Sequence, residues 1–506
     1  MIRERMAYLP PNKPFVLLEN SRDSDGVGYL FEDPEAIVCA ERPQEVDGAL
    51  AEIQAGVDRG LYAAGWIGYE VGLWLEPKLR QLMPADRAGP LIWMGLFAGR
   101  TRMGRPALEG FWRDRVMGRG FVFSPPEMTT ERSAYLQAVG KVKDYLAAGD
   151  IYQANLTMEA EGTVSGDPMA LHAALRKAQP VAFGAFVSTG DRCISSHSPE
   201  LFVSMAGNEA VVKPMKGTAP RGRWAEEDQE ARSALSADAK SQAENLMIVD
   251  LERNDLSRLS RPGTVKTEVL FEVEALPTAL QMTSKVTGVL EGKVGLDRLL
   301  RAIFPCGSVT GAPKVRAMEI IAELEARPRG VYTGAIGQIT PDGGATFNVP
   351  IRTLEIDGQG HYRFGVGSGI VSDSDAEAEY EECLLKSAFL SAPATRPCLI
   401  ETMRYEPGLG FPLLDGHLDR LMASATYFGY PLTAEGVRRA IQDHVQDLKT
   451  PSRVRLLAAP SGNLSVSSEP IMPAGDGVPT VAWASRAVSS SDPYLFHKTT
   501  RRDAYN

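Results

Sequence analysis

A run of small residues and prolines, SAPATRPC (391–398), divides the sequence into a long first part and a short second part. Proline interrupts helices, and a composition of Pro, Ala, Ser and Thr is typical of a linker between folded units. A helical pattern, AEAEYEECLLKSAFL (376–390), closes the first part, and a strand-like pattern, CLIETMRY (398–405), opens the second. We therefore expect a first domain over residues 1–390 and a second unit over residues 399–506.

Composition argues against several classes of protein. The chain has 506 residues, of which 44% are hydrophobic, too many for wholesale disorder. The chain has 54 Lys and Arg and 64 Asp and Glu, and the resulting net charge of −10 disfavours broad binding to nucleic acid. The five cysteines include no Cys-x-x-Cys pair, which argues against a disulfide framework and a zinc knuckle. No signal peptide and no apolar run of roughly 20 residues is evident, so we expect a cytoplasmic protein that does not engage membranes.

The first domain has the pattern of a mixed α and β structure. Residues 1–125 contain short apolar runs such as FVLL (15–18) and LIWMGLF (91–97), so we expect this part to be strand-rich. Beyond it, apolar residues at helical spacing alternate with strand-like pieces. The expected helices span about residues 130–146, 236–256, 312–326 and 376–390.

Carboxylates on two of these helices suggest a metal site. Glu379 and Glu382 are three residues apart on one helix face, with Lys386 one turn further along, and Glu244 lies on a different helix. Mg²⁺ prefers oxygen ligands, so carboxylates from two helices suit it. The alternative, favoured by spacing alone, is that these side chains form solvated helix faces.

Two further residues have the chemistry of catalytic groups. Lys216 follows an apolar strand and precedes a glycine, and a lysine in a desolvated cleft acts as a nucleophile or base. Glu200 follows a proline between apolar residues, where a raised pKa would suit a general acid. The alternatives are a loop lysine and an exposed glutamate.

A glycine-rich stretch, GVGSGIV (365–371), lacks the GxGxxG spacing of a dinucleotide site. Its backbone N–H groups instead suit an anionic group such as a carboxylate, with Arg352 as a bidentate partner. Cys306 has no evident histidine base nearby in the sequence, which favours an inert thiol.

Over about residues 10–390, the sequence contains motifs that resemble those of the chorismate-utilising enzymes in both order and amino-acid sequence. The motifs are GDIYQANLT (149–157), SPELF (198–202), KPMKGTAPRG (213–222), AENLMIVDLERNDLSR (243–258), FPCGSVTGAPKVRAMEII (304–321), GVYTGAIG (330–337), FNVPIRT (347–353) and GVGSGIVSDSDAEAEYEECLLKSA (365–388). The resemblance implies an α+β fold of two stacked, mostly antiparallel sheets with helices outside. Within this superfamily the chain is most similar to aminodeoxychorismate synthase component I, because Lys216 stands where anthranilate synthases usually carry alanine.

The resemblance also implies roles for the candidate residues. Glu200 matches the family's general acid, and Lys216 its nucleophile. Glu244 and Glu382 match Mg²⁺ ligands, with Glu379 close by. The positions that match the family's substrate-binding residues are Tyr332, Arg352, Lys386 and the backbone at Gly367, Ser368 and Gly369.

The implied activity is amination of chorismate to 4-amino-4-deoxychorismate, in the para-aminobenzoate branch of folate synthesis, with ammonia from a separate glutamine amidotransferase subunit. Two alternatives remain: an anthranilate synthase component I, and a non-catalytic tryptophan-binding subunit. Gln281, where many relatives have histidine, hints at the latter, as does LLENS (17–21), which resembles the motif around a tryptophan pocket. Ser241 stands where some relatives have another acid.

Residues 399–506 resemble the beginning of aminodeoxychorismate lyase, a protein of the class IV aminotransferase fold. The resemblance rests on LIETMR, LLDGHLDRLMASATYFGYP (413–431) and FHKTTRRDAY (496–505). Lys498 matches the lysine that binds pyridoxal phosphate, and Arg420 a residue near the cofactor phosphate. Because the family continues well beyond the point where this sequence stops, we expect a partial α/β unit that does not bind pyridoxal phosphate by itself.

Overall fold

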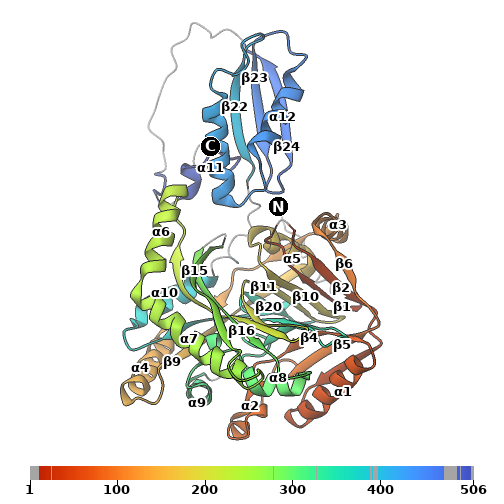
Figure 1. Cartoon of the computed structure of the whole chain (residues 1–506), viewed down its shortest axis with the longest axis vertical. Helices are drawn as coiled ribbons and strands as arrows, with labels where there is room; N and C mark the ends of the chain where they lie inside the picture. Colours follow the sequence, from red (N-terminus) through yellow and green to blue (C-terminus); the bar gives the residue numbers. More distant parts are fainter. Residues whose placement is uncertain are drawn as a thin grey trace. The chain divides into compact units, whose positions relative to one another are not determined.

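The computed structural model describes residues 11–23, 25–276, 279–325, 327–387, 390, 397–471, 487–490 and 492–502. The chain divides into two compact units, whose elements are labelled in Figure 1. The first comprises residues 1–218, 238–276 and 281–394, and the second comprises residues 219–237, 277–280 and 395–506. Most of the expected linker, residues 391–396, lies outside the described residues, so the linker stays a prediction.

The first unit contains two large sheets, and each strand pair with a described register is antiparallel. The first sheet has the spatial order β17 (Gly311–Ala312), β9 (Gln153–Gly166), β21 (His361–Ile370), β20 (Thr353–Ile356), β11 (Cys193–Ser198), β10 (Phe183–Thr189), β1 (Pro14–Glu19), β2 (Gly28–Glu32) and β6 (Thr101–Met103). Strands β7 (Phe121–Phe123) and β8 (Glu127–Met128) also pair with β9.

The second sheet carries the strand on which Lys216 lies. Its spatial order is β14 (Met215–Pro220), β16 (Ala279–Val289), β13 (Glu209–Lys213), β12 (Leu201–Ala206), β19 (Ala345–Asn348), β18 (Ala335–Ile339), β4 (Tyr62–Ile67), β5 (Ile92–Phe97) and β3 (Ala36–Ala40). Strand β15 (Lys266–Ala275) pairs with β16.

The two sheets pack face to face through a buried apolar layer. Val16 and Ile194 contribute to this layer from the first sheet, and Trp66 and Trp93 contribute from the second. The two indole rings stack with their centroids 5.2 Å apart. The layer excludes water from the centre of the sandwich, so polar side chains between the sheets have to find partners or line a cavity.

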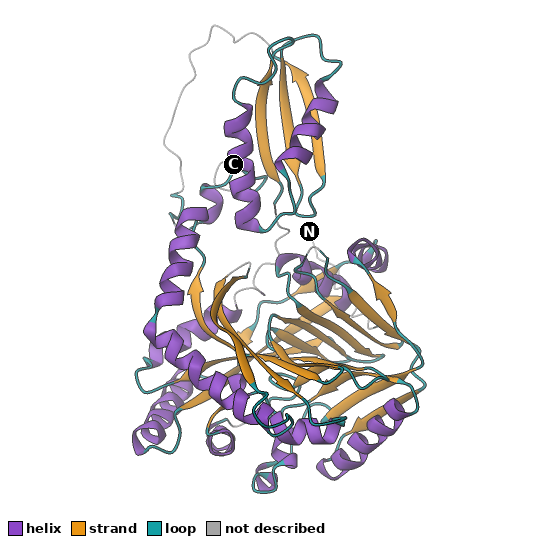
Figure 2. Ribbon diagram, viewed as in Figure 1, coloured by secondary structure: helices purple, strands orange, loops and turns teal. Residues whose placement is uncertain are grey.

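Helices cover the outer faces of both sheets (Figure 2). Helices α3 (Arg105–Val116), α4 (Arg132–Ala148), α5 (Pro168–Ala178), α9 (Lys314–Leu324) and α10 (Ala376–Ser387) share a core with the first sheet. Helices α1 (Val46–Asp58), α2 (Val71–Leu75), α7 (Ala239–Ser257) and α8 (Leu296–Ile303) share one with the second. The expected architecture of two stacked antiparallel sheets with outer helices is therefore confirmed.

Local sequence explains several of the helix boundaries. Helix α4 ends at Gly149, which has the left-handed φ of 79° typical of a helix C-terminus. The helix expected over 236–256 begins instead after Asp238, whose side chain accepts a hydrogen bond from the backbone N–H of Ser241. Residues 1–125 contain the expected strands, but helices α1 and α3 were not predicted from their sequence.

The second unit is built around a three-stranded antiparallel sheet in the order β22 (Leu399–Tyr405), β23 (Ser452–Ala458) and β24 (Leu464–Pro470). Helices α11 (Leu414–Phe428) and α12 (Ala434–Val445) share its apolar core. Helix α6 (Ala225–Ala237), which precedes α7 in the chain, also belongs to this unit. The hydroxyl of Tyr427 donates to the carbonyl of Gly222, 2.7 Å away, just before α6.

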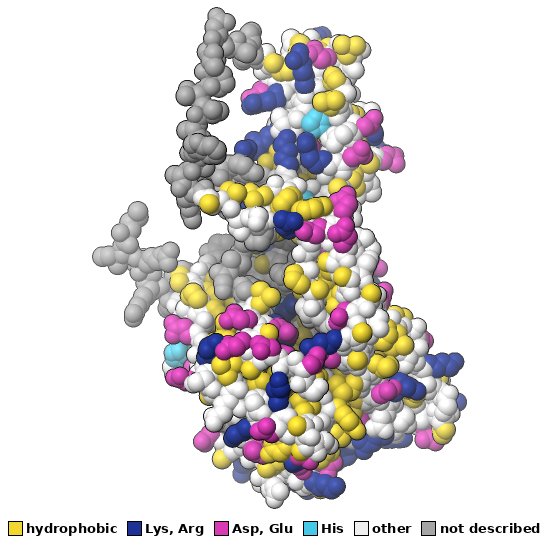
Figure 3. Space-filling view, turned by 90° about the vertical axis from the view of Figure 1, so that its left-hand side faces the viewer, with side chains coloured by type: hydrophobic (Ala, Val, Ile, Leu, Met, Phe, Trp, Pro, Cys, Tyr) yellow, Lys and Arg dark blue, Asp and Glu magenta, His cyan; other side chains and the backbone are white. Residues whose placement is uncertain are grey.

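The surface and the helices bear on the expected partners. None of the helices within the described ranges combines the length and the apolar character that crossing a membrane requires. Figure 3 shows Lys and Arg interspersed with Asp and Glu on the face that it draws. On that face the coloured side chains form no continuous basic field for a nucleic-acid backbone.

Candidate active site

The alternation of β9 and β21 places polar residues and glycines between the two sheets. Leu156 and Val366 belong to the core under the helices, whereas Gln153 and Gly367 have the opposite parity along their strands. On this inner side lies a cavity of about 280 Å³.

Nearly all the residues singled out in the sequence line this cavity. Strand β14, helices α7 and α10, strand β21 and the loops before β12, β18 and β20 contribute them. The residues are Glu200, Lys216, Glu244, Tyr332, Arg352, Gly367, Gly369, Glu379, Glu382 and Lys386.

Ser368 is placed differently from its two glycine neighbours. Its side chain is 1% exposed and lies 2.9 Å from the hydroxyl of Tyr135 on α4, beneath the helices. Only the backbone of Ser368 is therefore at the level of the cavity, which is consistent with an expectation that concerned the backbone alone.

Lys216 is held in a crowded part of the cavity wall. Gly217 has a φ of 93°, and a β-carbon there would lie 3.0 Å from the β-carbon of Ser241 on α7. The side-chain amide of Asn245 donates to the carbonyl of Lys216 at 3.3 Å. Burial, with the nearby Lys386 ammonium, lowers the pKa of Lys216 from its ordinary value, although carboxylates such as Glu244 oppose the shift. A lowered pKa increases the fraction of neutral, nucleophilic amine.

Glu200 is the most deeply buried acid of the cavity wall, at 3% exposure. The hydroxyl of Ser308 donates to its Oε1 at 2.6 Å. Burial raises the pKa of Glu200 to about 7, despite the opposing effects of Ser308 and Lys216. A carboxyl group that keeps its proton near neutrality is suited to protonating a departing oxygen.

The three remaining carboxylates lie on α7 and α10. Burial raises the pKa of Glu244, whereas Lys386, 2.6 Å from Glu382 Oε1, brings the pKa of Glu382 below its ordinary value in spite of burial. Ser374 donates to Glu379 at 2.7 Å. Their oxygen donors suit Mg²⁺ in kind. Among the described residues, however, no three His, Cys, Asp or Glu side chains converge closely enough to hold a metal ion by themselves.

Arg352 and the glycines of β21 form a wall of the cavity whose chemistry suits an anionic group. Burial lowers the pKa of Arg352 to about 10, and its Nη1 is buried with no hydrogen-bond partner among the described residues. A β-carbon on Gly369 would lie 2.7 Å from Gln153 Nε2 and 2.9 Å from Lys216 Nζ. Gly369 therefore lets these side chains approach the backbone, while Arg352 has an unused donor for a carboxylate.

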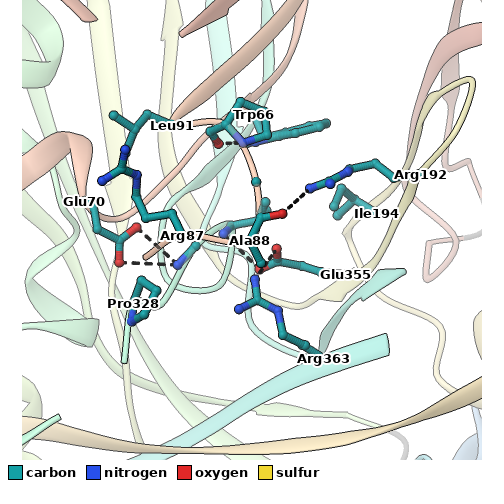
Figure 4. A pocket seen from close by; sticks show the side chains of 14 residues that line it. Trp66, Glu70, Arg87, Ala88, Leu91, Arg192, Ile194, Pro328, Glu355 and Arg363 are labelled. Atoms are coloured by element: carbon teal, nitrogen blue, oxygen red, sulfur yellow. Dashed lines mark hydrogen bonds and ion pairs between the residues drawn. The ribbon is translucent and has the colours of Figure 1, made fainter. Parts of the chain in front are cut away.

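Two buried carboxylates hold the loop that carries Tyr332, and Figure 4 shows them around a small neighbouring pocket. Glu70 accepts from the backbone N–H of Arg329 at 2.6 Å, and burial raises its pKa to about 6. Glu355 accepts from the backbone N–H groups of Val331 at 2.9 Å and Tyr332 at 3.3 Å. The ring of Tyr332 packs over Gly365, where a β-carbon would lie 2.2 Å from it. This pocket supports the cavity wall from behind.

Sequence reasoning missed several polar residues in and beside the cavity. Gln153 has both side-chain amide atoms buried without a described partner, beside Lys216. Thr218 donates its hydroxyl to Gln281 at 3.1 Å, so the amide that replaces the family's histidine is already engaged. The polar residues at alternate positions of Gln153, Asn155 and Thr157 were the available signal.

The residues around LLENS are engaged within the protein. Glu19 Oε2 accepts from the indole N–H of Trp112 at 3.1 Å and from Arg176 at 2.7 Å, and His172 stacks on Trp112 with ring centroids 4.8 Å apart. Although burial alone would raise it, Arg176 and His172 lower the pKa of Glu19 to about 2. The carboxylate of Glu19 is thus already bound by the indole of Trp112, so it is not free to bind an external indole.

In the second unit, the two residues expected near pyridoxal phosphate share one carboxylate. Arg420 donates to both oxygens of Glu401, at 2.8 and 2.6 Å, and Lys498 Nζ lies 3.9 Å from Glu401 Oε2. His417 also binds Glu401, at 2.7 Å. Arg420 is therefore engaged by a carboxylate rather than held ready for a phosphate, which fits the cofactor poorly. Residues 503–505 of the matching motif lie outside the described residues.

Comparison with known proteins finds two different families along the chain. Residues 120–392 match the family model described as chorismate binding enzyme, and residues 398–506 match the model described as amino-transferase class IV. The structure is similar to anthranilate synthase component I of Streptococcus pneumoniae, with a TM-score of 0.62, 26% identity, and coverage of 72% of this chain and 92% of that one.

Two curated relatives carry different names at similar identity. Aminodeoxychorismate synthase component 1 of Escherichia coli is 43% identical over 50% of this chain and 55% of its own length. Anthranilate synthase component 1 of Thermus thermophilus is 40% identical over 58% of this chain and 63% of its own length. The chain spans about half the length of the curated relatives it matches. The first match covers more than half of the chain and contains the whole of the cavity wall, and the chain belongs to the chorismate binding enzyme family.

Proposed function

We propose that this protein aminates chorismate to 4-amino-4-deoxychorismate. The observation that carries the proposal is the position of Lys216, whose Nζ lies in the cavity against Gly369 and whose pKa is lowered by burial. Relatives that bear the name aminodeoxychorismate synthase support it. An uncharged amine in this place is a nucleophile that an alanine would not supply.

Lys216 and Glu200 divide the work of displacing the 4-hydroxyl group. The neutral amine of Lys216 attacks C2 of the ring, both conjugated ring double bonds shift by one position towards C4, and the 4-hydroxyl leaves as water with the proton of Glu200. Ammonia then adds at C4, both double bonds shift back, and the C2–nitrogen bond to Lys216 breaks. Two displacements on the same ring place the amino group on the face that the hydroxyl occupied.

The substrate carboxylates meet the cationic side of the cavity. Arg352 supplies its unused Nη1 donor, Lys386 is fixed by its bond to the carbonyl of Gly367 at 2.9 Å, and Tyr332 closes the wall over Gly365. Glu244 and Glu382, with Glu379, would hold Mg²⁺ when it binds, together with waters and a substrate carboxylate. The ion would supply Lewis-acid polarisation and orientation of that carboxylate.

Ammonia is proposed to come from a separate glutamine amidotransferase subunit, in a cytoplasmic pathway that leads to para-aminobenzoate and folate. The role of the second unit as a partial aminodeoxychorismate lyase without bound pyridoxal phosphate is likewise a proposal.

The second candidate function is that of anthranilate synthase component I, because relatives with that name match at similar identity. The two activities differ in their product. Anthranilate synthase also eliminates pyruvate, so product identity separates them.

The test is a product analysis of the purified chain with chorismate, Mg²⁺ and a fixed concentration of free ammonia. We expect 4-amino-4-deoxychorismate from the native chain and its loss in Lys216→Ala. Lys213→Ala is the matched control, because Lys213 lies on β13, the preceding strand in the chain, and pairs with Glu274 outside the cavity. Anthranilate from the native chain would favour the second candidate, and no consumption of chorismate, with ammonia or with an added amidotransferase and glutamine, would contradict both.

A further inference from the structure

A second buried carboxyl group lies behind the cavity wall, on helix α7. Glu252 is 1% exposed and does not line the cavity, and none of the proposed catalytic roles uses it. Burial of a carboxyl group is unfavourable unless its neighbours compensate for the lost water. The neighbours of Glu252 lead directly to Glu200.

A continuous line of hydrogen-bonding atoms joins the two carboxyl groups. The thiol of Cys306 donates to Glu252 Oε1 at 3.4 Å, and Cys306 Sγ lies 3.1 Å from Ser308 Oγ, where either atom can donate. Ser308 Oγ lies 2.6 Å from Glu200 Oε1. All four residues are at most 3% exposed, so water does not compete for these contacts.

The surroundings of Glu252 allow its carboxyl group to be either neutral or charged. Burial raises its pKa to about 7, and Lys314 on α9 opposes the shift, while Asp255 on its own helix adds to it. Its Oε1 accepts from the backbone N–H of Gly307 at 2.8 Å, and its Oε2 is buried with no described partner. The raised pKa leaves both forms of the carboxyl group populated at neutrality, and the N–H of Gly307 and Lys314 stabilise the charged form.

We propose that Glu252, Cys306 and Ser308 form a proton relay that reprotonates Glu200 after it has given its proton to the departing hydroxyl group. The inference rests on the proposed function, in which Glu200 is the general acid. Glu252 does not touch the substrate. It is a positioning residue, because it acts on the reaction only by supplying a proton to Glu200.

The relay moves one proton and no electrons. When Glu252 Oε1 carries the proton, the thiol of Cys306 turns to Ser308 Oγ. Glu252 Oε1 then passes its proton to Cys306 Sγ as the thiol passes its own proton to Ser308 Oγ, and Ser308 passes its hydroxyl proton to Glu200 Oε1. The negative charge thus moves from Glu200 to Glu252, where the N–H of Gly307 and Lys314 face it. The relay resets after the product has left: the reverse transfer returns the proton from Glu200 to Glu252, and Glu200 then takes a new proton from water in the open cavity.

A purely structural role makes a different prediction. In that case Glu252 only anchors the loop at Gly307, and the thiol of Cys306 only fills space. Replacing the thiol by a hydroxyl, as in Cys306→Ser, or by hydrogen, as in Cys306→Ala, would then have equivalent effects on turnover, because both smaller side chains fit the space.

The test compares Cys306→Ala, Cys306→Ser and Glu252→Gln in the ammonia-dependent assay. Alanine breaks the line, serine keeps a group that both accepts and donates, and glutamine keeps an acceptor for Gly307 but lacks the acid. We expect kcat to fall by about tenfold or more in Cys306→Ala and Glu252→Gln. The KM for chorismate should change by less than about twofold, and Cys306→Ser should recover most of the lost kcat. Equal kcat values in the native, Cys306→Ala and Glu252→Gln proteins, or equal losses in Cys306→Ala and Cys306→Ser, would overturn the relay.

Infrared spectra of the protein without substrate, recorded as a function of pH, measure the protonation of the buried carboxyl groups independently of turnover. We expect protonated carboxyl bands from the buried groups with raised pKa values, which include Glu70, Glu200 and Glu252, and one of these bands should be missing in Glu252→Gln. If the band assigned to Glu252 is absent below pH 7, the relay is overturned even where the protein consumes chorismate. If the band is present but the native chain consumes no chorismate, the proposed function fails, and with it the need for a relay.

Discussion

The ammonium nitrogen of Lys216 lies against the α-carbon of Gly369, so close that a β-carbon on Gly369 would stand 2.9 Å from it. The two residues lie on different sheets, β14 and β21, and their approach fixes where the amine points. Because Lys216 Nζ is the flexible end of a long side chain, it can move away from an added methyl group at little cost in stability.

Gly369→Ala is accordingly expected to reduce turnover of chorismate by about tenfold or more while leaving the unfolding midpoint nearly unchanged. Steady-state kinetics and thermal unfolding measure the two effects. Gly140→Ala on α4 is the matched control, since nothing lies within 4 Å of the added carbon, and it should stabilise the protein by about 0.4–1 kcal/mol with normal activity. Normal activity in Gly369→Ala would contradict the placement of the amine.

Activity should decline as the pH rises above about 7. Glu200 has its pKa raised to about 7, so it holds the proton that a general acid needs below that pH and loses it above. Lys216 must be neutral, which limits activity on the acid side, so the profile is bell-shaped. The measurement is kcat/KM against pH at constant free ammonia. Ser308→Ala removes a hydrogen bond that lowers this pKa, so its basic limb should move to higher pH, and an unmoved limb would assign it to another group.

Arg352→Lys should weaken binding of the substrate more than it slows turnover. The guanidinium has a buried Nη1 donor without a described partner, and a lysine ammonium cannot reproduce its planar pair of donors. We expect the KM for chorismate to rise by about 10- to 100-fold, measured by initial rates. Arg363→Lys is a useful comparison, because Arg363 pairs with Glu355 behind the wall, at 3.2 Å. A KM unaffected by Arg352→Lys would remove Arg352 from the substrate site.

Glu19 should stabilise the fold at neutral pH and lose this effect in acid. Its pKa is lowered from 4.5 to about 2, so its contribution is complete above about 4.5 and disappears as the pH falls towards 2. Glu19→Gln is expected to lower the free energy of unfolding by about 3 kcal/mol at pH 7, and by less at pH 3. Urea unfolding at the two pH values measures this. Glu109→Gln, which touches the same Arg176 from a 40% exposed position, should cost less.

Free tryptophan should neither inhibit the protein nor raise its melting temperature. The carboxylate of Glu19 is already bound by the indole of Trp112, which is 1% exposed. Trp112→Ala should destabilise the protein by about 3–5 kcal/mol, and added indole should recover part of the loss by filling the space. Thermal unfolding with and without each ligand is the measurement. Inhibition of the native chain by tryptophan would instead favour the tryptophan-binding alternative.

How much the sequence predicted depends on how local the signal is. The motifs around Lys216 and Glu200 carry their identity in consecutive residues, and the structure places both residues in one cavity, while their roles stay predictions. The fold of two stacked sheets was predicted from the family resemblance that the same motifs carry. The contact between Glu200 and Ser308 joins residues 108 positions apart, and no periodicity encodes such a pair. Helices α1 and α3 were missed because apolar residues of strands dominated the pattern around them.

Helix α6 gives the molecule a property that its linear order hides. The chain leaves the first unit after Thr218, two residues beyond Lys216, contributes α6 to the second unit, and returns at Asp238, just ahead of Glu244. A gene cut between residues 391 and 398 would therefore separate α6 from its partner helix α11 and leave both fragments with an unfinished surface. The second unit cannot be exchanged as one continuous segment, and engineering that replaces it has to change the residues between Lys216 and helix α7 as well.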